Sequence, residues 1–356
     1  MNLERSERTR RALMEHCQRY PDLKIRDVFK YLYQSSFGCE HMVSSLDGAI
    51  DWIRKEYETV LGTGCSGTLE QLDGQYVRVH LDWLNCGLSP ETLGKLFYLS
   101  AKTEESGQSD LERKLEVALE MADCGELPFE LEEFSKEVEA WKAEGCPAVH
   151  HSEAFRQAYH PAYRLVAQEF VAMLPLLCEI DGRRGERLVV SIEGGSASGK
   201  TTLSQMLEAV YDCTVFHMDD FFLRPEQRTP QRFAEPGGNV DRERFLEEVL
   251  EPMSRGDEIR YRKFDCSTFT LGEPVCVERK PLVIVEGAYS MHPELAKHYD
   301  LSVFLDVGPE VQRKRIEKRN GTEMAKRFHN EWIPLEQLYF SEMDVKERCE
   351  LCIFVE

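Results

Sequence analysis

The 356-residue chain lacks any apolar run long enough to cross a bilayer, and its first residues lack the apolar core of a secretion signal. A spanning helix needs about 20 mostly apolar residues, so we expect no membrane span. Basic residues are also in deficit, because 44 Lys and Arg face 64 Asp and Glu, for a net charge of −20. This balance argues against a nucleic-acid or anionic-membrane partner. We therefore expect a cytoplasmic protein that acts on a small molecule, with a homo-oligomer left open.

Paired cysteine motifs are scarce, although the chain has 12 cysteines. The only CxxC runs from Cys349 to Cys352, in an alternating apolar stretch typical of a terminal strand. A single such pair is weak support for a zinc site. Without a secretion signal, we expect reduced thiols rather than a disulfide framework.

Length and composition predict two domains, with a change in pattern near residues 179–186. Residues 1–180 predict a mainly helical domain, since apolar residues recur at helical spacing over 111–121 and 154–177. Residues 181–356 alternate short apolar runs with helical segments. This alternation predicts an α/β fold, with a mostly parallel sheet flanked by helices. The predicted strands are 188–192, 213–217, 282–285 and 301–305.

A phosphate-binding motif follows the first strand of the second domain. The segment matches GxxxxGK[ST] in full, with a strand before it and a helix after it, as the motif requires. Glycines allow backbone N–H groups to face a phosphate, Lys200 would reach the β- and γ-phosphates, and Thr201 would ligate Mg²⁺. The nucleotide-binding residues are Gly194, Gly195, Ser196, Ala197, Ser198, Gly199, Lys200, Thr201 and Thr202.

The loop alone does not separate GTPases, ATPases and small-molecule kinases, but the motifs after it do. In chain order these are His217–Phe222 with Asp219, Gly238–Asp241, Tyr261–Asp265, Val285–Tyr289 and Arg313–Arg319. In this order and spacing, residues 187–356 resemble the uridine kinase and phosphoribulokinase family of P-loop kinases. The resemblance implies a P-loop kinase fold, ATP and Mg²⁺ as cofactors, and transfer of the γ-phosphoryl group to a hydroxyl of a small molecule.

The resemblance also implies catalytic and metal-binding roles. Asp219 would be the general base that takes the acceptor's proton and lies near the metal, with a helix N-cap as the alternative. Glu286 would join Thr201 at Mg²⁺, with a buried ion pair as the alternative. Arg315 and Arg319 would be lid arginines that stabilise the transferring phosphoryl group, or else part of a solvated helix face.

On the acceptor side, the resemblance assigns Asp241 to the sugar hydroxyls, with a cap of the following helix as the alternative. Phe264, Asp265 and Tyr289 are further acceptor-side candidates. The family usually has Tyr where Phe264 stands, and the His that reads a pyrimidine base is missing from residues 267–269. A site without these partners discriminates a base poorly, so either a nucleoside or another alcohol fits as acceptor.

The first half contains no catalytic motif with a known mechanism. Its histidines gather around two segments, but no HExxH or comparable metal-ligand spacing occurs. They are either polar residues of a core or an interface, or part of a second ligand site that binds the kinase substrate or its phosphorylated product. The histidines concerned are His41, His80, His150, His151 and His160.

Two other functions compete with a kinase. One is a nucleotide-gated regulatory or binding protein, and the other is a bifunctional enzyme with a second active site in the first half. Asp219 and Asp241 favour the kinase, because a switch needs no base facing an acceptor hydroxyl.

Overall fold

The computed structural model of the protein describes residues 2–39, 43–62, 64–101, 107–183, 185 and 187–355. The chain divides into two compact units, Met1–Asp181 and Gly182–Glu356. His41, one of the histidines of the first half, lies outside the described residues. None of the described helices is both long and apolar enough to cross a membrane.

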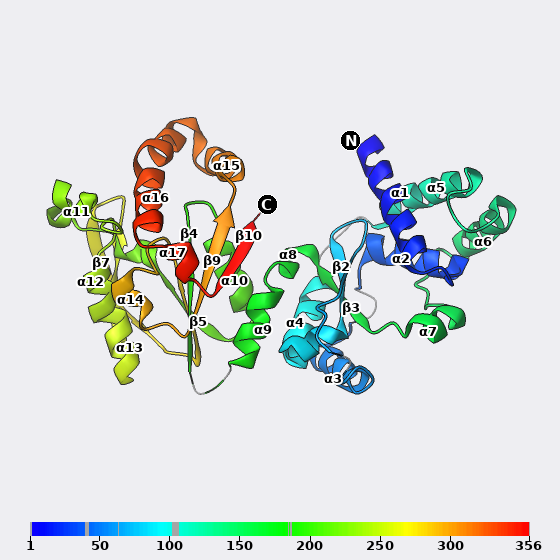
Figure 1. The fold of residues 1–356 in the computed structure, drawn as a ribbon, viewed down its shortest axis with the longest axis horizontal. Coiled ribbons are helices and arrows are strands. Elements are labelled where there is room, and N and C mark those ends of the chain that lie inside the picture. The colour runs from blue at the N-terminus through cyan, green and yellow to red at the C-terminus, as the bar shows by residue number, and fades with distance from the viewer. Residues whose placement is uncertain are drawn as a thin grey trace. The chain divides into compact units, whose positions relative to one another are not determined.

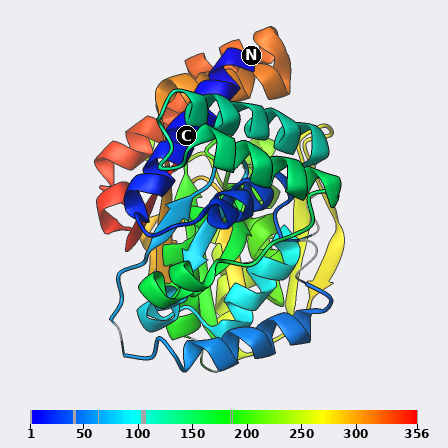
Figure 2. The same cartoon turned by 90° about the vertical axis from the view of Figure 1, so that its right-hand side faces the viewer.

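Helices dominate the first unit, as the sequence predicts. They are α1 (Asn2–Arg19), α2 (Ile25–Phe37), α3 (Leu46–Tyr57), α4 (Pro90–Ser100), α5 (Gly107–Asp123), α6 (Leu131–Ala143), α7 (Glu153–Tyr159), α8 (Gln168–Val171) and α9 (Leu174–Gly182). A small antiparallel sheet, which the sequence did not predict, has strands β1 (Leu69–Gln71), β2 (Tyr76–His80) and β3 (Tyr163–Ala167) in that order. Helices α1, α2, α5 and α6 lie on one side of this sheet, and α3 and α4 on the other (Figures 1 and 2).

The helical pattern over 154–177 does not form one continuous helix, so that expectation is wrong. Helix α7 ends where His160 adopts a left-handed conformation with φ of 43°, and Pro161 follows it. The next residues form β3, whose Leu165 and Val166 are buried when it pairs with β2. Tertiary pairing therefore overrides the local apolar spacing. The pattern over 111–121, by contrast, lies within α5.

The second unit confirms the predicted α/β class. Its parallel sheet has the order β10-β9-β4-β8-β5. These strands are β4 (Leu188–Gly194), β5 (Cys213–His217), β8 (Leu282–Glu286), β9 (Leu301–Val307) and β10 (Leu351–Val355), and a separate hairpin pairs β6 (Ile259–Asp265) with β7 (Thr270–Val277). Every residue of β4 and β8 is buried, as is typical of a parallel sheet covered on both faces.

Short helices follow most strands of this sheet. They are α10 (Lys200–Val210), η3 (Met218–Phe221), η4 (Pro225–Gln227), α11 (Pro230–Ala234), α12 (Arg242–Phe245), η5 (Leu246–Leu250), α13 (Glu251–Arg255), α14 (Pro293–Ala296), α15 (Pro309–Arg327), η6 (Phe328–Trp332), α16 (Ile333–Glu342) and α17 (Val345–Arg348). The carboxyl ends of β4, β5 and β8 share one edge of the sheet, which is where ligands of such sheets bind.

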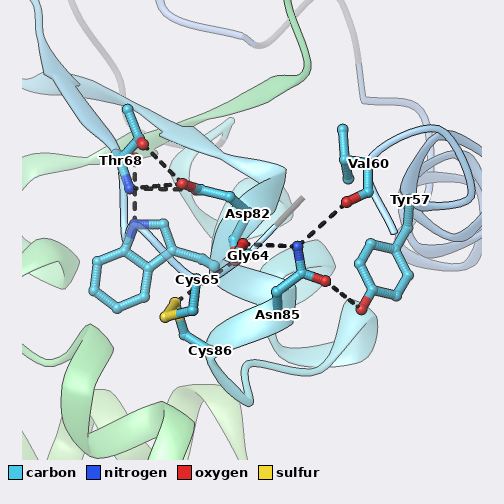
Figure 3. The surroundings of a disulfide bond; sticks show 9 residues. Tyr57, Val60, Gly64, Cys65, Thr68, Asp82, Asn85 and Cys86 are labelled. Carbon is cyan, nitrogen blue, oxygen red and sulfur yellow. Dashed lines mark hydrogen bonds between the residues drawn. A yellow bond between two sulfur atoms is a disulfide. The ribbon is translucent and has the colours of Figure 1, made fainter. Parts of the chain in front are cut away.

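One disulfide corrects the expectation that all thiols are reduced. Cys65 and Cys86 are bonded, with Cα atoms 5.0 Å apart, and the other ten cysteines are free (Figure 3). The chain after α3 returns alongside the 3₁₀ helix η2 (Leu81–Cys86), where Asn85 donates to the carbonyls of Val60 and Gly64. Cys65 and Cys86 are 21 positions apart and belong to no recognisable motif, so the sequence did not reveal the pair.

Reduction of this disulfide should destabilise the first unit. Opening a loop of this size restores chain entropy to the unfolded state, and we expect a loss of about 3 kcal/mol in the free energy of unfolding. Urea unfolding of Cys65→Ser tests this, with Cys124→Ser as a control at an exposed free thiol. A count of twelve reactive thiols in denaturant without reductant would contradict the pairing.

Candidate active site

The phosphate-binding loop connects β4 to α10. Gly194 has φ of 151°, and a Cβ there would lie 2.7 Å from the carbonyl oxygen of Leu305, so no other residue fits. Gly199, with φ of 103°, begins α10. The Lys200 ammonium donates to the carbonyls of Gly194 and Gly195 at 2.8 and 2.9 Å. The nine candidate residues therefore run without a break from the end of β4 through the loop into the first turn of α10, whose N-terminus favours an anion.

Two polar groups meet at the carboxyl ends of β5 and β8. His217 and Glu286 are register partners on these strands, and His217 Nδ1 lies 2.6 Å from Glu286 Oε1. The Thr201 hydroxyl donates to the same carboxylate oxygen at 3.2 Å. This carboxylate raises the pKa of His217. Glu286 thus has an imidazole partner that the sequence did not indicate, and it also touches the predicted metal ligand Thr201.

Asp219 lies two residues beyond the end of β5, on η3. It caps no helix: His217 holds the N-cap position of η3 and makes no side-chain cap. Its side chain is exposed, yet crowding by surrounding atoms raises its pKa, and the charge of Glu286 adds to this effect. The Lys200 ammonium acts in the opposite direction. A carboxyl with a raised pKa, open to solvent beside the phosphate-binding lysine, suits a general base.

The oxygen donors at this edge suit Mg²⁺, which prefers carboxylate and hydroxyl ligands together with substrate phosphates. Thr201, Asp219 and Glu286 would hold the ion. Within the described part of the chain, no three His, Cys, Asp or Glu residues could hold a metal by themselves. The protein therefore offers only a partial set of ligands, as is usual where nucleotide phosphates complete the coordination.

The two lid candidates behave differently. Arg315 on α15 lies 3.4 and 3.5 Å from the carbonyls of Ala197 and Ser198, directly against the phosphate-binding loop. Arg319, one turn further on, bonds Asn320 and lies over the ring of Phe328, 5.8 Å from its centre. The structure therefore brings Arg315 to the loop and leaves Arg319 on its own helix.

Helices α15 and α16 contact the phosphate-binding loop through residues that the sequence did not indicate. Glu336 accepts hydrogen bonds from the backbone N–H and the hydroxyl of Ser196, at 2.9 and 2.6 Å. Gln312 of α15 donates to the Ser196 carbonyl at 2.8 Å. Because these contacts join residues about 116 and 140 positions apart, no local spacing could have indicated them.

A fully buried carboxyl, Glu193, stands immediately before the loop. It accepts hydrogen bonds from the backbone N–H groups of Gly194, Tyr289 and Met291 and from the hydroxyl of Tyr339. Burial raises its pKa to about 7, against the opposing effect of these donors. Glu193 thus ties the end of β4 to the segment after β8 and to α16.

The raised pKa of Glu193 predicts a pH effect on stability. Its stabilising contribution is complete below the unfolded pKa near 4.5 and declines as the pH rises to about 7. We expect the free energy of unfolding of the wild type, relative to Glu193→Gln, to fall by about 3 kcal/mol across this window. Chemical unfolding at several pH values measures the difference, and Glu317→Gln, at an exposed position, is the control. A difference that does not change with pH would show that Glu193 ionises as freely in the folded as in the unfolded protein.

Asp241 caps a helix, which is one of the two roles that the sequence left open, and its role toward an acceptor stays a prediction. One carboxylate oxygen accepts from the Arg244 backbone N–H and caps α12. The other oxygen faces the Arg224 and Arg244 guanidinium groups at 3.5 and 3.6 Å but accepts no hydrogen bond among the described residues, although Asp241 is only 1% exposed. The residue lines a cavity of about 590 Å³ with almost entirely polar walls, formed by Arg224, Gln227, Thr229, Gln231, Arg232, Glu235, Asp241, Glu243, Arg244, Glu247, Glu248 and Leu271.

The other acceptor-side candidates do not line this cavity. Phe264 is buried on β6, beside Phe269. The Asp265 carboxylate accepts from the backbone and hydroxyl of Ser267 in a local turn. Tyr289 is buried against Tyr339. The structure thus brings Asp241, but none of these three residues, to the polar cavity.

Comparisons with known proteins find only distant relatives. No family model matches the chain. The uridine kinases of two Chloroflexus aurantiacus strains are each 26% identical to it over 149 residues, which span 39% of this chain and 70% of those proteins. Two solved structures also match: a possible uridine kinase from Bacillus stearothermophilus (22% identity, TM-score 0.39, 48% of this chain and 89% of that one) and a shikimate kinase from Bacteroides thetaiotaomicron (16%, 0.25, 46% and 84%).

The nucleotide loop and the parallel sheet give the second unit a P-loop fold of the α/β class. Within this class, roughly half of the chain is distantly related to the uridine kinase and phosphoribulokinase family, so the resemblance seen in the sequence is confirmed. The other half has no assigned relative.

Proposed function

We propose that the protein is an ATP-dependent kinase that phosphorylates a hydroxyl group of a small molecule. The observation that carries this proposal is the placement of Asp219. Its accessible carboxyl lies at the strand edge with Lys200 and Glu286 as electrostatic neighbours. A nucleotide switch needs a positioned water, whereas a kinase needs such a base facing an acceptor.

In this mechanism, the loop amides and Lys200 hold the nucleotide phosphates, and Asp219 takes the proton of the acceptor hydroxyl. The acceptor oxygen forms a bond to the γ-phosphorus as the bond from that phosphorus to the β-phosphate oxygen breaks, which releases ADP. Arg315 would stabilise the charge on the transferring group. Thr201, Asp219 and Glu286 would hold Mg²⁺, which would supply positive charge to neutralise the phosphates.

We further propose that the acceptor is a small hydroxyl compound without a pyrimidine ring. Two observations support this narrower assignment: Phe264 lacks the hydroxyl of the family tyrosine, and the cavity beside Asp241 has polar rather than aromatic walls. Polar walls suit a polyhydroxylated molecule better than a planar base, because hydroxyl groups can satisfy the buried oxygen of Asp241.

An acceptor screen tests this proposal. ATP consumption by the full-length protein with Mg²⁺ would be measured against nucleosides, sugars, pantothenate-like alcohols and hydroxy acids, with a control that lacks acceptor. We expect turnover that depends on a sugar-like acceptor. Turnover with uridine alone would overturn the assignment of an acceptor without a pyrimidine ring. ATP consumption at the same rate with and without acceptors would favour a nucleotide-gated regulator.

A further inference from the structure

A buried lysine without a counter-charge stands out in the first unit. Lys30 on α2 is only 9% exposed, and among the described residues its ammonium donates to the Val149 carbonyl, at 3.2 Å. No carboxylate pairs with Lys30 among the residues that the structure describes. A buried ammonium without an anion is costly, and burial accordingly lowers its pKa to about 8.

Other cations surround this lysine. The charges of Arg26, Arg78 and Arg156 all act on Lys30, and each lowers its pKa further. Arg78 is neutralised by Glu70 at 2.9 Å, but neither Arg26 nor Arg156 forms an ion pair in the described part of the chain. Lys30 is thus buried near two exposed arginines that have no ion pair among the described residues and whose charges act on it, in a protein whose net charge is −20.

Asp27, the acid whose charge acts on Lys30, already accepts hydrogen bonds from other groups. Asp27 accepts from His151 Nδ1 at 3.0 Å and from the backbone and hydroxyl of Ser152 at 2.9 and 2.6 Å. Its remaining bond comes from the Lys24 backbone N–H. Because these donors hold Asp27 ionised, with a pKa of about 2, the carboxylate stabilises its own loop and is not free to move to Lys30.

The same loop also holds two of the cations, Lys30 and Arg26. The Val149 carbonyl accepts from Lys30, and the adjacent His150 carbonyl accepts from Arg26 at 3.0 Å. His151 extends the arrangement, since its Nε2 lies 2.7 Å from the hydroxyl of Tyr163 on β3. The pKa of His151 is lowered to about 4, so the ring is neutral at pH 7 and adds no charge. A pre-organised group of cations binds an anion with little further loss of freedom.

We propose that Lys30, Arg26 and Arg156 form a binding site for the phosphate group of a small phosphomonoester. A phosphate dianion matches several cations, and guanidinium groups bind its oxygens in pairs. Phosphomonoesters are also the class of product that the proposed kinase reaction would release, and only this link rests on the proposed function.

Counting phosphate sites on the full-length chain tests the proposal. Equilibrium dialysis with radiolabelled inorganic phosphate should find two sites on the wild type, one at the phosphate-binding loop and one at Lys30. Lys200→Ala should retain one site, and Lys200→Ala with Lys30→Gln should retain none. A Lys200→Ala protein that binds no phosphate, or phosphate binding that survives in the double variant Lys200→Ala with Lys30→Gln, would overturn the proposal.

Two further variants test whether a loss of phosphate affinity comes from the removed charge rather than from unfolding. Arg156→Gln changes an exposed residue and should weaken the site in the Lys200→Ala background by about tenfold, the loss of one charge-assisted contact. Lys142→Gln removes an exposed charge from α6 and should change nothing. Unchanged affinity in Arg156→Gln would exclude that residue from the site.

Glycerol 3-phosphate distinguishes an ester from free phosphate. We expect it to bind the Lys200→Ala protein more tightly than inorganic phosphate does, and equal affinity would overturn the assignment to a phosphomonoester. Since Lys200→Ala disables the nucleotide site, the result does not depend on kinase activity. A failed acceptor screen beside an intact Lys30 site would reject the proposed function alone.

Discussion

Asp219→Asn should lower the turnover of the kinase reaction by about 10²-fold or more, the usual contribution of a general base. Asparagine keeps the size of the side chain but cannot take the proton of the acceptor. The affinity for ATP should change little, because the loop amides and Lys200 hold the phosphates. Steady-state kinetics with the acceptor from the screen, together with direct measurement of ATP binding, separate the two effects.

Asp220→Asn provides the matched control. The neighbouring carboxylate is already engaged by the Tyr261 hydroxyl at 3.2 Å and by the Lys263 ammonium at 3.0 Å. Its loss should therefore reduce turnover far less than the loss of Asp219. Full activity in Asp219→Asn, or an equal loss in Asp220→Asn, would show that the base is assigned to the wrong residue.

The pH profile offers an independent check on Asp219. Because its pKa is raised above the ordinary aspartate value, the acid limb of kcat/KM should lie at a higher pH than a normal carboxyl gives. Asp219→Asn should abolish this limb in the residual activity. A limb that persists in the variant would belong to another group.

Local patterns in the sequence were enough to predict the nucleotide loop and the strands of the parallel sheet, but not the hairpin of β6 and β7. A buried parallel strand reads as an apolar run, and the loop between Gly194 and Thr201 depends on the residues within it. The ends of β5 and β8 were located in the same way, because each strand stops where its apolar run meets an acidic motif.

Contacts between distant residues were beyond such patterns. The bond between Ser196 and Glu336 spans 140 positions, and Glu336 lies in a helix whose sequence shows no motif. The His217–Glu286 pair depends on strand register, which only the folded sheet reveals. In the first unit, the apolar residues of β3 match a helical spacing. The sequence therefore revealed neither this strand nor the polar contacts that it makes.

Lys200→Ala should reduce phosphoryl transfer by about 10²–10³-fold, the scale expected when one stabilising donor is lost from a transition state. The affinity for ATP should fall as well, in contrast with Asp219→Asn. In the structure, the ammonium donates to the Gly194 and Gly195 carbonyls, so it is already held at the mouth of the loop. Comparing KM for ATP and kcat between Lys200→Ala and Asp219→Asn tests whether Lys200 acts in ATP binding and transfer while Asp219 acts in transfer alone.

The same substitution should also change the acid–base behaviour of Asp219. The Lys200 charge lowers the pKa of that carboxyl, so its removal should raise the pKa and move the ionisation to higher pH. Lys200→Arg keeps the charge and should restore the ionisation, while its bulkier head fails to restore full transfer. Carbon NMR of the labelled aspartate follows the ionisation without needing activity. An Asp219 signal that titrates identically in all three proteins would mean that Lys200 does not act on the base, and its role would be confined to the phosphates.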